Sequence, residues 1–371
     1  QVTEPTTFIY IMLLAMCFYM PTISLSNSIS YTSLKLSNKD VVKDFPPIRV
    51  FGTIGFIVAM WITNLTGNKA TEYQFYIAGI AALLLGFYAF TLPKCEPQRL
   101  TKENASLTET LGLEAFKLFG NYKMALFFVF SMFLGGALQL TNAYGDVFLD
   151  EFKHFPKYAD SFVVEYSTII MSISQISETL FILAIPFFLK RFGIKQVMLI
   201  SMLAWVLRFG LFAFSDPVQG LWMIVLSCVV YGMAFDFFNI SGSLFVETNT
   251  EPKNRSSAQG LFMMMTNGFG AILGSFTSGW AIDKYFTKTF NNTTELSTYL
   301  QTEQSNTLMS EFVKGHGITI SADGVFSNPI LMKDWHSIWI SFAVYALVIA
   351  IAFAVLFKHK HNPEDVENVM H

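Results

Sequence analysis

Four short stretches of the sequence combine side chains that could bind a small polar ligand. In each stretch polar or aromatic residues recur three or four positions apart, which places them on one face of a helix. Carboxamides both donate and accept hydrogen bonds, and aromatic rings stack on flat heteroaromatic groups. This set favours a neutral, flat ligand that carries hydroxyl groups. The four sets are Arg49, Thr53 and Phe56; Gln139 and Asn142; Gln175 and Glu178; and Tyr231 and Phe235, with Asp236 and Asn239 close behind.

Ionisable residues also lie inside strongly apolar segments, at Arg49, Glu178, Arg208 and Asp236. A charge in lipid is costly, so such residues usually face a cavity or a partner. Glu178 and Asp236 are candidates to carry a proton, and Arg49 could tune the pKa of a carboxylate. Other interpretations stay open. The amides could simply tie helices together, the aromatic rings could be packing, and Arg208 could pair or snorkel.

The elements that must position these residues are predicted to be membrane-spanning helices. The chain has 371 residues, of which 53% are hydrophobic and 14% charged, against about 25% charged in an ordinary soluble domain. A spanning helix needs about 20 mostly apolar residues. The sequence predicts an all-α polytopic membrane protein with nine such spans, at about 8–32, 48–66, 73–92, 124–149, 163–189, 196–214, 219–246, 257–284 and 335–357.

Positive charge in the connecting loops predicts the orientation. Short loops rich in Lys and Arg alternate with poor ones, and the rich loops should be cytoplasmic. The segment 285–334 is then external and the C-terminal tail cytoplasmic. An external start, nine spans and no initiator Met suggest that three helices of a twelve-helix transporter precede this chain. We expect such a fragment not to transport by itself.

The longest and most charged cytoplasmic loop suggests a division into two helical halves. We expect residues 1–93 to be the remainder of an N-terminal bundle, 94–123 a central cytoplasmic linker and 124–371 a C-terminal six-helix bundle. Within that second bundle, the external segment at about 287–333 looks like an insertion.

Composition argues against several functions. A net charge of −3 without a long basic run does not favour binding to nucleic acid. The three cysteines have no spacing typical of a zinc site or disulfide framework, and none of the six histidines falls inside an apolar span. The spans hold no nucleophile–base pair. We therefore expect no enzyme, metal site or cofactor.

Five sequence strings resemble the bacterial nucleoside–proton symporter family of the major facilitator superfamily. Residues 44–56 (DFPPIRVFGTIGF) resemble its fifth helix and residues 138–142 (LQLTN) its seventh. Residues 172–182 (SISQISETLFI) and 231–243 (YGMAFDFFNISGS) are similar to the eighth and tenth, and residues 258–270 (AQGLFMMMTNGFG) to the eleventh. The strings occur in order, and the likeness covers nearly the whole chain outside the external segment.

This resemblance implies a major facilitator fold, with about nine of twelve helices present, in two bundles around a cavity. It implies import of purine and pyrimidine nucleosides with protons across the bacterial inner membrane, by a protein expected to be a monomer. A permease for another small polar solute such as a sugar, or a receptor that does not transport, remains an alternative. The family's nucleoside contacts would fall on Arg49, Thr53, Phe56, Gln139, Asn142, Gln175, Glu178, Tyr231 and Phe235.

Overall fold

The computed structural model describes residues 4–39, 41–68, 71–92, 113–155, 157–251, 255–301, 313 and 318–359. The chain forms two compact units, which divide between Asn104 and Ala105.

The first unit is made of three apolar helices, α1 (Pro5–Leu36), α2 (Val41–Leu65) and α3 (Tyr73–Ala89). Helix α1 packs against α2, and the rings of Phe8 and Phe75 meet edge to face at 5.7 Å between α1 and α3. Large apolar side chains such as Phe51 and Phe87 are exposed. Extensive exposed apolar surface is typical of a protein that lipid covers.

The second unit carries the remaining elements, which are mostly helical. Two short 3₁₀ helices flank its first long helix, and η3 is a π-helix inserted between α9 and α10. In chain order the elements are η1 (Leu113–Gly120), α5 (Tyr122–Glu151), η2 (Phe152–His154), α6 (Phe162–Glu165), α7 (Ser167–Ala213), α8 (Leu221–Asn249), α9 (Arg255–Met263), η3 (Met264–Gly270), α10 (Ala271–Tyr285), β1 (Thr287–Asn292), α11 (Thr293–Leu300), β2 (Val325–Lys333) and α13 (Trp335–Leu356).

Helix α7 is two helices joined at a sharp bend. Gly193 has φ 76° and ψ 169°, a conformation that is not helical and that residues with a Cβ rarely adopt. The bend lies in the segment that contains Lys190, Arg191 and Lys195, where the sequence predicts a cytoplasmic loop between two spans. The chain therefore turns at Gly193, and α7 consists of one helix before this residue and one after it.

The core of the second unit lies between α5, both halves of α7, α8, the α9–α10 segment and α13. Glycines bring α5 against η3 at backbone distance. A Cβ on Gly135 would lie 1.9 Å from the Thr266 carbonyl oxygen, and one on Gly270 would lie 2.4 Å from the Met132 carbonyl oxygen. Glycine at these two positions therefore permits close helix approach, and no larger residue fits there.

Four of the described helices are long and apolar enough to cross a membrane by length and composition. They are α5 with η2, α7, α8 and α13. A mostly helical membrane class is thus supported, although the two-stranded sheet of β1 and β2 departs from the all-α prediction, and the count of nine spans stays a prediction. Shorter apolar helices cover Pro5–Tyr19, Val50–Leu65 and Tyr73–Ala89.

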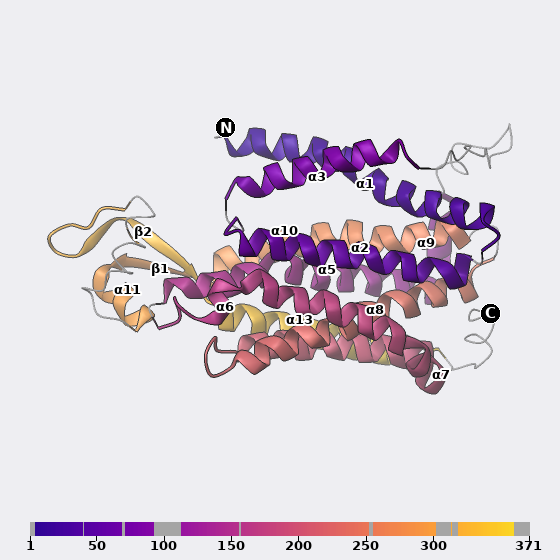
Figure 1. The fold of residues 1–371 in the computed structure, drawn as a ribbon. Helices are drawn as coiled ribbons and strands as arrows, with labels where there is room; N and C mark the ends of the chain where they lie inside the picture. The colour runs from indigo at the N-terminus through magenta and orange to yellow at the C-terminus, as the bar shows by residue number, and fades with distance from the viewer. Residues whose placement is uncertain are drawn as a thin grey trace. The chain divides into compact units, whose positions relative to one another are not determined.

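The segment after α10 forms a small lobe at the end of the helices where α6 lies (Figure 1). Strand β1 pairs antiparallel with β2, and α11 packs on β1. Glu151 at the end of α5 accepts hydrogen bonds from Lys333 Nζ at 2.9 Å and from Trp335 Nε1 at 2.6 Å, which ties the lobe to the helices. The lobe has its own apolar core of Phe290, Leu296, Leu300, Val313, Phe326, Ile330 and Met332.

Candidate functional site

Helices α7 and α8 cross at backbone distance beside Glu178. A Cβ on Gly232 would lie 2.5 Å from the Ser177 carbonyl carbon and 2.6 Å from the Glu178 nitrogen. The Ser177 hydroxyl donates a hydrogen bond across the crossing to the Val229 carbonyl oxygen. The crossing therefore fixes where the Glu178 side chain leaves α7 relative to α8.

Tyr231 is the point at which several predicted site residues meet. Its buried phenol lies beside the Gln175 amide and within electrostatic reach of the Glu178 and Asp236 carboxylates. One turn along α8, the ring of Phe235 stacks on that of Tyr231 with centroids 5.9 Å apart and planes at 4°. The structure thus brings together an amide and an aromatic pair from α7 and α8, with two carboxylates within electrostatic reach of the phenol.

Arg208 holds Tyr231 from the second half of α7. Its guanidinium is fully buried and lies 4.7 Å from the centre of the Tyr231 ring and 5.0 Å from that of Phe212. Nη1 donates to the Ser227 carbonyl oxygen at 2.7 Å, and Nε donates to the Thr141 hydroxyl at 3.4 Å. Of the two interpretations of Arg208, pairing and snorkelling, the structure supports pairing with polar groups. It also shows cation–π contacts of the guanidinium with two rings.

Two further predicted residues lie on α5, and three lie on α2 in the first unit. On α5 Gln139 is half-buried and Asn142 is exposed. On α2, in the first unit, Thr53 is half-buried and Phe56 is exposed. The side chain of Arg49 lies outside the described residues. Their roles in a site remain predictions.

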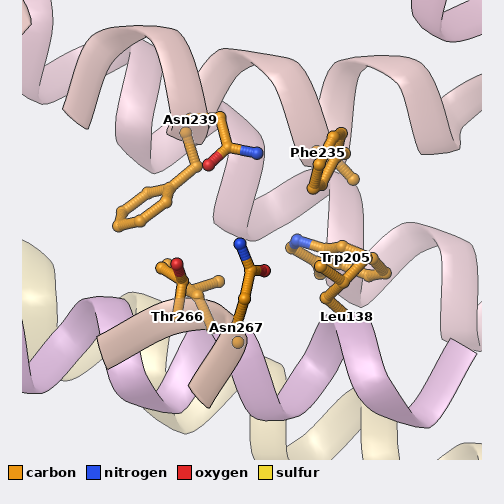
Figure 2. A pocket seen from close by; sticks show the side chains of 10 residues that line it. Leu138, Trp205, Phe235, Asn239, Thr266 and Asn267 are labelled. Atoms are coloured by element: carbon orange, nitrogen blue, oxygen red, sulfur yellow. The ribbon is translucent and has the colours of Figure 1, made fainter. Parts of the chain in front are cut away.

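A pocket lies between α5, α7, α8 and η3, adjacent to the Tyr231–Phe235 pair. Its wall includes apolar groups from Leu138, Phe235 and Trp205, and polar groups from Asn239 and Asn267 (Figure 2). Sequence reasoning singled out Phe235 and noted Asn239 but missed Trp205, Thr266 and Asn267. A polar Thr-Asn pair inside an apolar span is the signal that could have drawn attention to η3.

No cluster of three or more His, Cys, Asp or Glu able to hold a metal ion occurs among the residues that the structure describes. The site instead consists of amides, carboxylates and aromatic rings between apolar helices. A polytopic helical protein with such a polar cluster at mid-helix has the features of a membrane transporter for small polar solutes.

Comparison with known proteins gives the family. The model of the family described as nucleoside H+ symporter matches residues 1–310. The chain belongs to this family. The resemblance seen in the sequence is therefore confirmed, and the family is one of transporters, as expected, and not of enzymes.

Several relatives are similar over nearly the whole chain. Xanthosine permease of Escherichia coli K12 is 49% identical over 369 residues, which cover 99% of this chain and 78% of that protein. Nucleoside permease NupG of the same organism is 46% identical over 374 residues, covering 100% and 79%. The crystal structure of nucleoside transporter NupG matches with a TM-score of 0.77 at 46% identity over 97% of this chain and 78% of that one. That of a NupG mutant matches with a TM-score of 0.80, covering 96% and 79%.

Proposed function

We propose that this protein imports nucleosides together with protons by alternating access across the bacterial inner membrane. The observation that carries the proposal is the cluster of Gln175, Glu178, Tyr231 and Phe235 at the crossing of α7 and α8. Its chemistry suits a nucleoside, because a carboxylate and an amide can bind ribose hydroxyls while aromatic rings pack on the base. Membership of the nucleoside H+ symporter family supports the same substrates.

The proposed contacts extend to residues outside that cluster. Gln139 and Asn142 of α5 would add amide contacts to the base or ribose. Thr53 and Phe56 of α2 would add a hydroxyl and a ring from the N-terminal bundle. Arg49 would tune the charge of a carboxylate. The sequence pattern and the family resemblance support these assignments.

The coupling proton is assigned to Glu178, with Asp236 as the second candidate. Both are carboxylates near the Tyr231 phenol, and ionisable groups within helical membrane proteins commonly relay protons. A proton on Glu178 would neutralise the carboxylate, and nucleoside and proton would then be released together on the cytoplasmic side. The proton is the coupling ion, and we propose that no cofactor takes part.

The proposed organisation follows the charge of the loops. Residues 1–93 belong to an N-terminal bundle, 94–123 form the cytoplasmic linker and 124–371 form the C-terminal bundle. The C-terminus is cytoplasmic, the lobe at about 287–333 is an external insertion, and the protein acts as a monomer. Alternation of basic and non-basic loops supports this orientation.

Uptake of radiolabelled uridine by the full-length protein in proteoliposomes tests the function. We expect an inward proton gradient to drive accumulation that unlabelled purine and pyrimidine nucleosides compete away, and collapse of the gradient with a protonophore to abolish accumulation. Protein-free liposomes are the control. Folded protein that takes up no nucleoside under either condition would contradict the proposal and favour another solute. Saturable binding without net flux would favour a receptor.

A further inference from the structure

Asn267, Asn239 and Trp205 contribute polar groups to the pocket between α5, α7, α8 and η3, and none of the three is among the predicted nucleoside contacts. Asn267 lies on the π-helix η3, Asn239 on α8 and Trp205 on the second half of α7. In Figure 2 the two carboxamides point toward one another across the pocket, and the indole nitrogen of Trp205 points into it. Three separate elements thus converge on one space.

The polar groups of this pocket make few hydrogen bonds within the protein. Among the described residues, none is recorded for the Asn239 carboxamide or the Trp205 indole nitrogen, although the Trp205 side chain is 2% exposed. Asn267 donates only to the Met263 sulfur, at 3.6 Å, and thioether sulfur is a weak acceptor. Asn239 is half-buried and Asn267 is exposed, so both carboxamides are open to a partner in the pocket. A ligand is a natural partner for groups left in this way.

The remaining walls of the pocket are apolar or aromatic. Phe235 and Leu138 face it in Figure 2, and Trp205 packs against Phe209 at 5.5 Å and against Tyr231 edge to face at 5.9 Å. Few, well-placed polar groups in an apolar pocket are typical of small-molecule sites. A flat ring with hydrogen-bonding groups only at its edge fits both kinds of wall.

The π-helix accounts for the position of Asn267. A π turn interrupts the regular spacing of an α-helix and occurs often at functional sites. Here it lies where Gly135 lets α5 approach the Thr266 backbone. The Thr266 hydroxyl donates back to the Phe262 carbonyl oxygen at 3.1 Å, so Thr266 is used within its own helix. Asn267 is the next residue of η3 and lines the pocket together with residues of α8.

The pocket adjoins the cluster of Gln175, Glu178, Tyr231 and Phe235, because Phe235 belongs to both. Tyr231, Phe235 and Asn239 are four residues apart, so they follow one face of α8. The rise from Tyr231 to Asn239 is about 12 Å at 1.5 Å per residue. A ligand could therefore contact the carboxylates at one end and the two asparagines at the other, with Phe235 between them.

We propose that Asn239 and Asn267 are specificity-determining residues that hydrogen-bond the edge of the nucleobase, with Trp205 donating a third hydrogen bond. This inference rests on the proposed function and adds where the base lies. A carboxamide can form a paired donor and acceptor contact with a base edge, and aromatic walls pack on the base face. The ribose then lies toward Gln175 and Glu178.

The test compares base and sugar discrimination in the full-length protein in proteoliposomes. The variants are Asn239→Leu and Asn267→Leu, which keep side-chain size but remove hydrogen bonding, and Asn249→Leu on the end of α8 is the matched control. Labelled uridine uptake is competed with nucleosides altered at the base edge and, separately, with 2′-deoxynucleosides. A site built around hydrogen bonds discriminates strongly against ligands that lack them.

We expect both pocket variants to lose about tenfold or more of the discrimination between base-edge analogues, and to keep the wild-type preference between ribose and 2′-deoxyribose. A purely structural role would change both preferences together. Unchanged base discrimination in variants that still transport would overturn the inference and leave the proposed function standing. A wild-type protein that transports no nucleoside would overturn the proposed function itself. If a Leu variant fails to fold, Asn→Thr at the same position replaces it.

Intrinsic fluorescence gives a second, direct measure of where the base lies. Trp205→Phe keeps an aromatic ring, and Trp222→Phe, at an exposed position on α8, is the control. We expect uridine to change the emission of the wild type and of Trp222→Phe, and this change to be largely lost in Trp205→Phe. A change that persists in full without Trp205 would overturn the placement of the base in this pocket.

Discussion

Glu178 stands at the helix crossing where the proposed coupling of proton and nucleoside takes place. Its backbone nitrogen lies against Gly232, and its carboxylate is near the Tyr231 phenol. A carboxylate in this position can bind a hydroxyl when charged and lose its charge by taking up a proton. Arg208 touches the same tyrosine from the other side but is already engaged by Ser227 and Thr141.

Replacing Glu178 with Gln separates binding from coupling. The amide keeps the size and hydrogen bonding of the side chain but cannot exchange a proton at neutral pH. We expect Glu178→Gln to lose uridine accumulation driven by a proton gradient, while exchange of internal for external nucleoside continues. Proteoliposome uptake and counterflow measure the two activities, with Glu165→Gln at the exposed end of α6 as the control. A Glu178→Gln protein that still concentrates uridine would exclude Glu178 as the proton carrier.

At the scale of the helix, glycines set how closely the transport helices approach. Gly232 permits the contact of α8 with α7, and Gly135 and Gly270 permit that of α5 with η3. In lipid, helices gain little from hydrophobic burial against one another, so close backbone packing stabilises their association. These contacts also set where Glu178 and Asn267 lie relative to α8.

A methyl group at Gly232 should displace Glu178. We expect Gly232→Ala to lower nucleoside uptake by about tenfold or more, because misplacement of a site group by about 1 Å is known to cost up to about 100-fold. Gly210→Ala on α7 is the matched control, since nothing lies within 4 Å of a Cβ there. Uptake rates and thermal stability in detergent are compared. Equal uptake by both variants would show that the crossing does not control the site.

The loops outside the membrane contribute a pH-dependent contact. Burial raises the pKa of Asp216, but hydrogen bonds from Tyr158 and from the backbone nitrogens of Gln219 and Val218 outweigh it and hold that pKa below its ordinary 3.8. A carboxylate whose pKa is lowered by folding stabilises the protein above its ordinary pKa. That stabilisation is lost as the pH falls through the folded value.

We therefore expect Asp216→Asn to lower the melting temperature at pH 7, and the difference from the wild type to shrink as the pH drops below about 4. Asp160→Asn, in an exposed turn of the neighbouring loop, is the control. Thermal unfolding of purified protein between pH 3 and pH 7 measures the effect. A difference that stayed constant over this range would show that the Asp216 charge is not what stabilises the loop.

At the scale of the whole molecule, the external lobe and the end of α13 lie on opposite sides of the membrane in the proposed topology. Thr298 is exposed on α11, and Lys358 follows α13. In a background in which Cys17, Cys95 and Cys228 are replaced, we expect Thr298→Cys to react with an impermeant maleimide in spheroplasts. Lys358→Cys should react only after permeabilisation. The opposite labelling pattern would reverse the predicted orientation.

The class of protein and the family follow from the amino-acid sequence alone. Long apolar runs with clustered basic loops require helices in lipid, and local strings such as residues 231–243 carry the family resemblance. Spacing along one helix also predicted that Gln175 and Glu178 share a face, as do Tyr231 and Phe235. These features depend only on residues within one or two turns of the same helix, so the sequence alone predicts them.

The faces of separate helices that contact one another are visible only in the tertiary structure. The sequence could not show that Gly232 allows α8 to pack against α7 beside Glu178. It also could not show that Arg208 donates hydrogen bonds to Ser227 and Thr141. It also missed Trp205 and Asn267, because their meeting with Asn239 depends on a π turn and on close packing between helices far apart in the chain. Contacts between separate helices follow from packing geometry, which no single helix encodes.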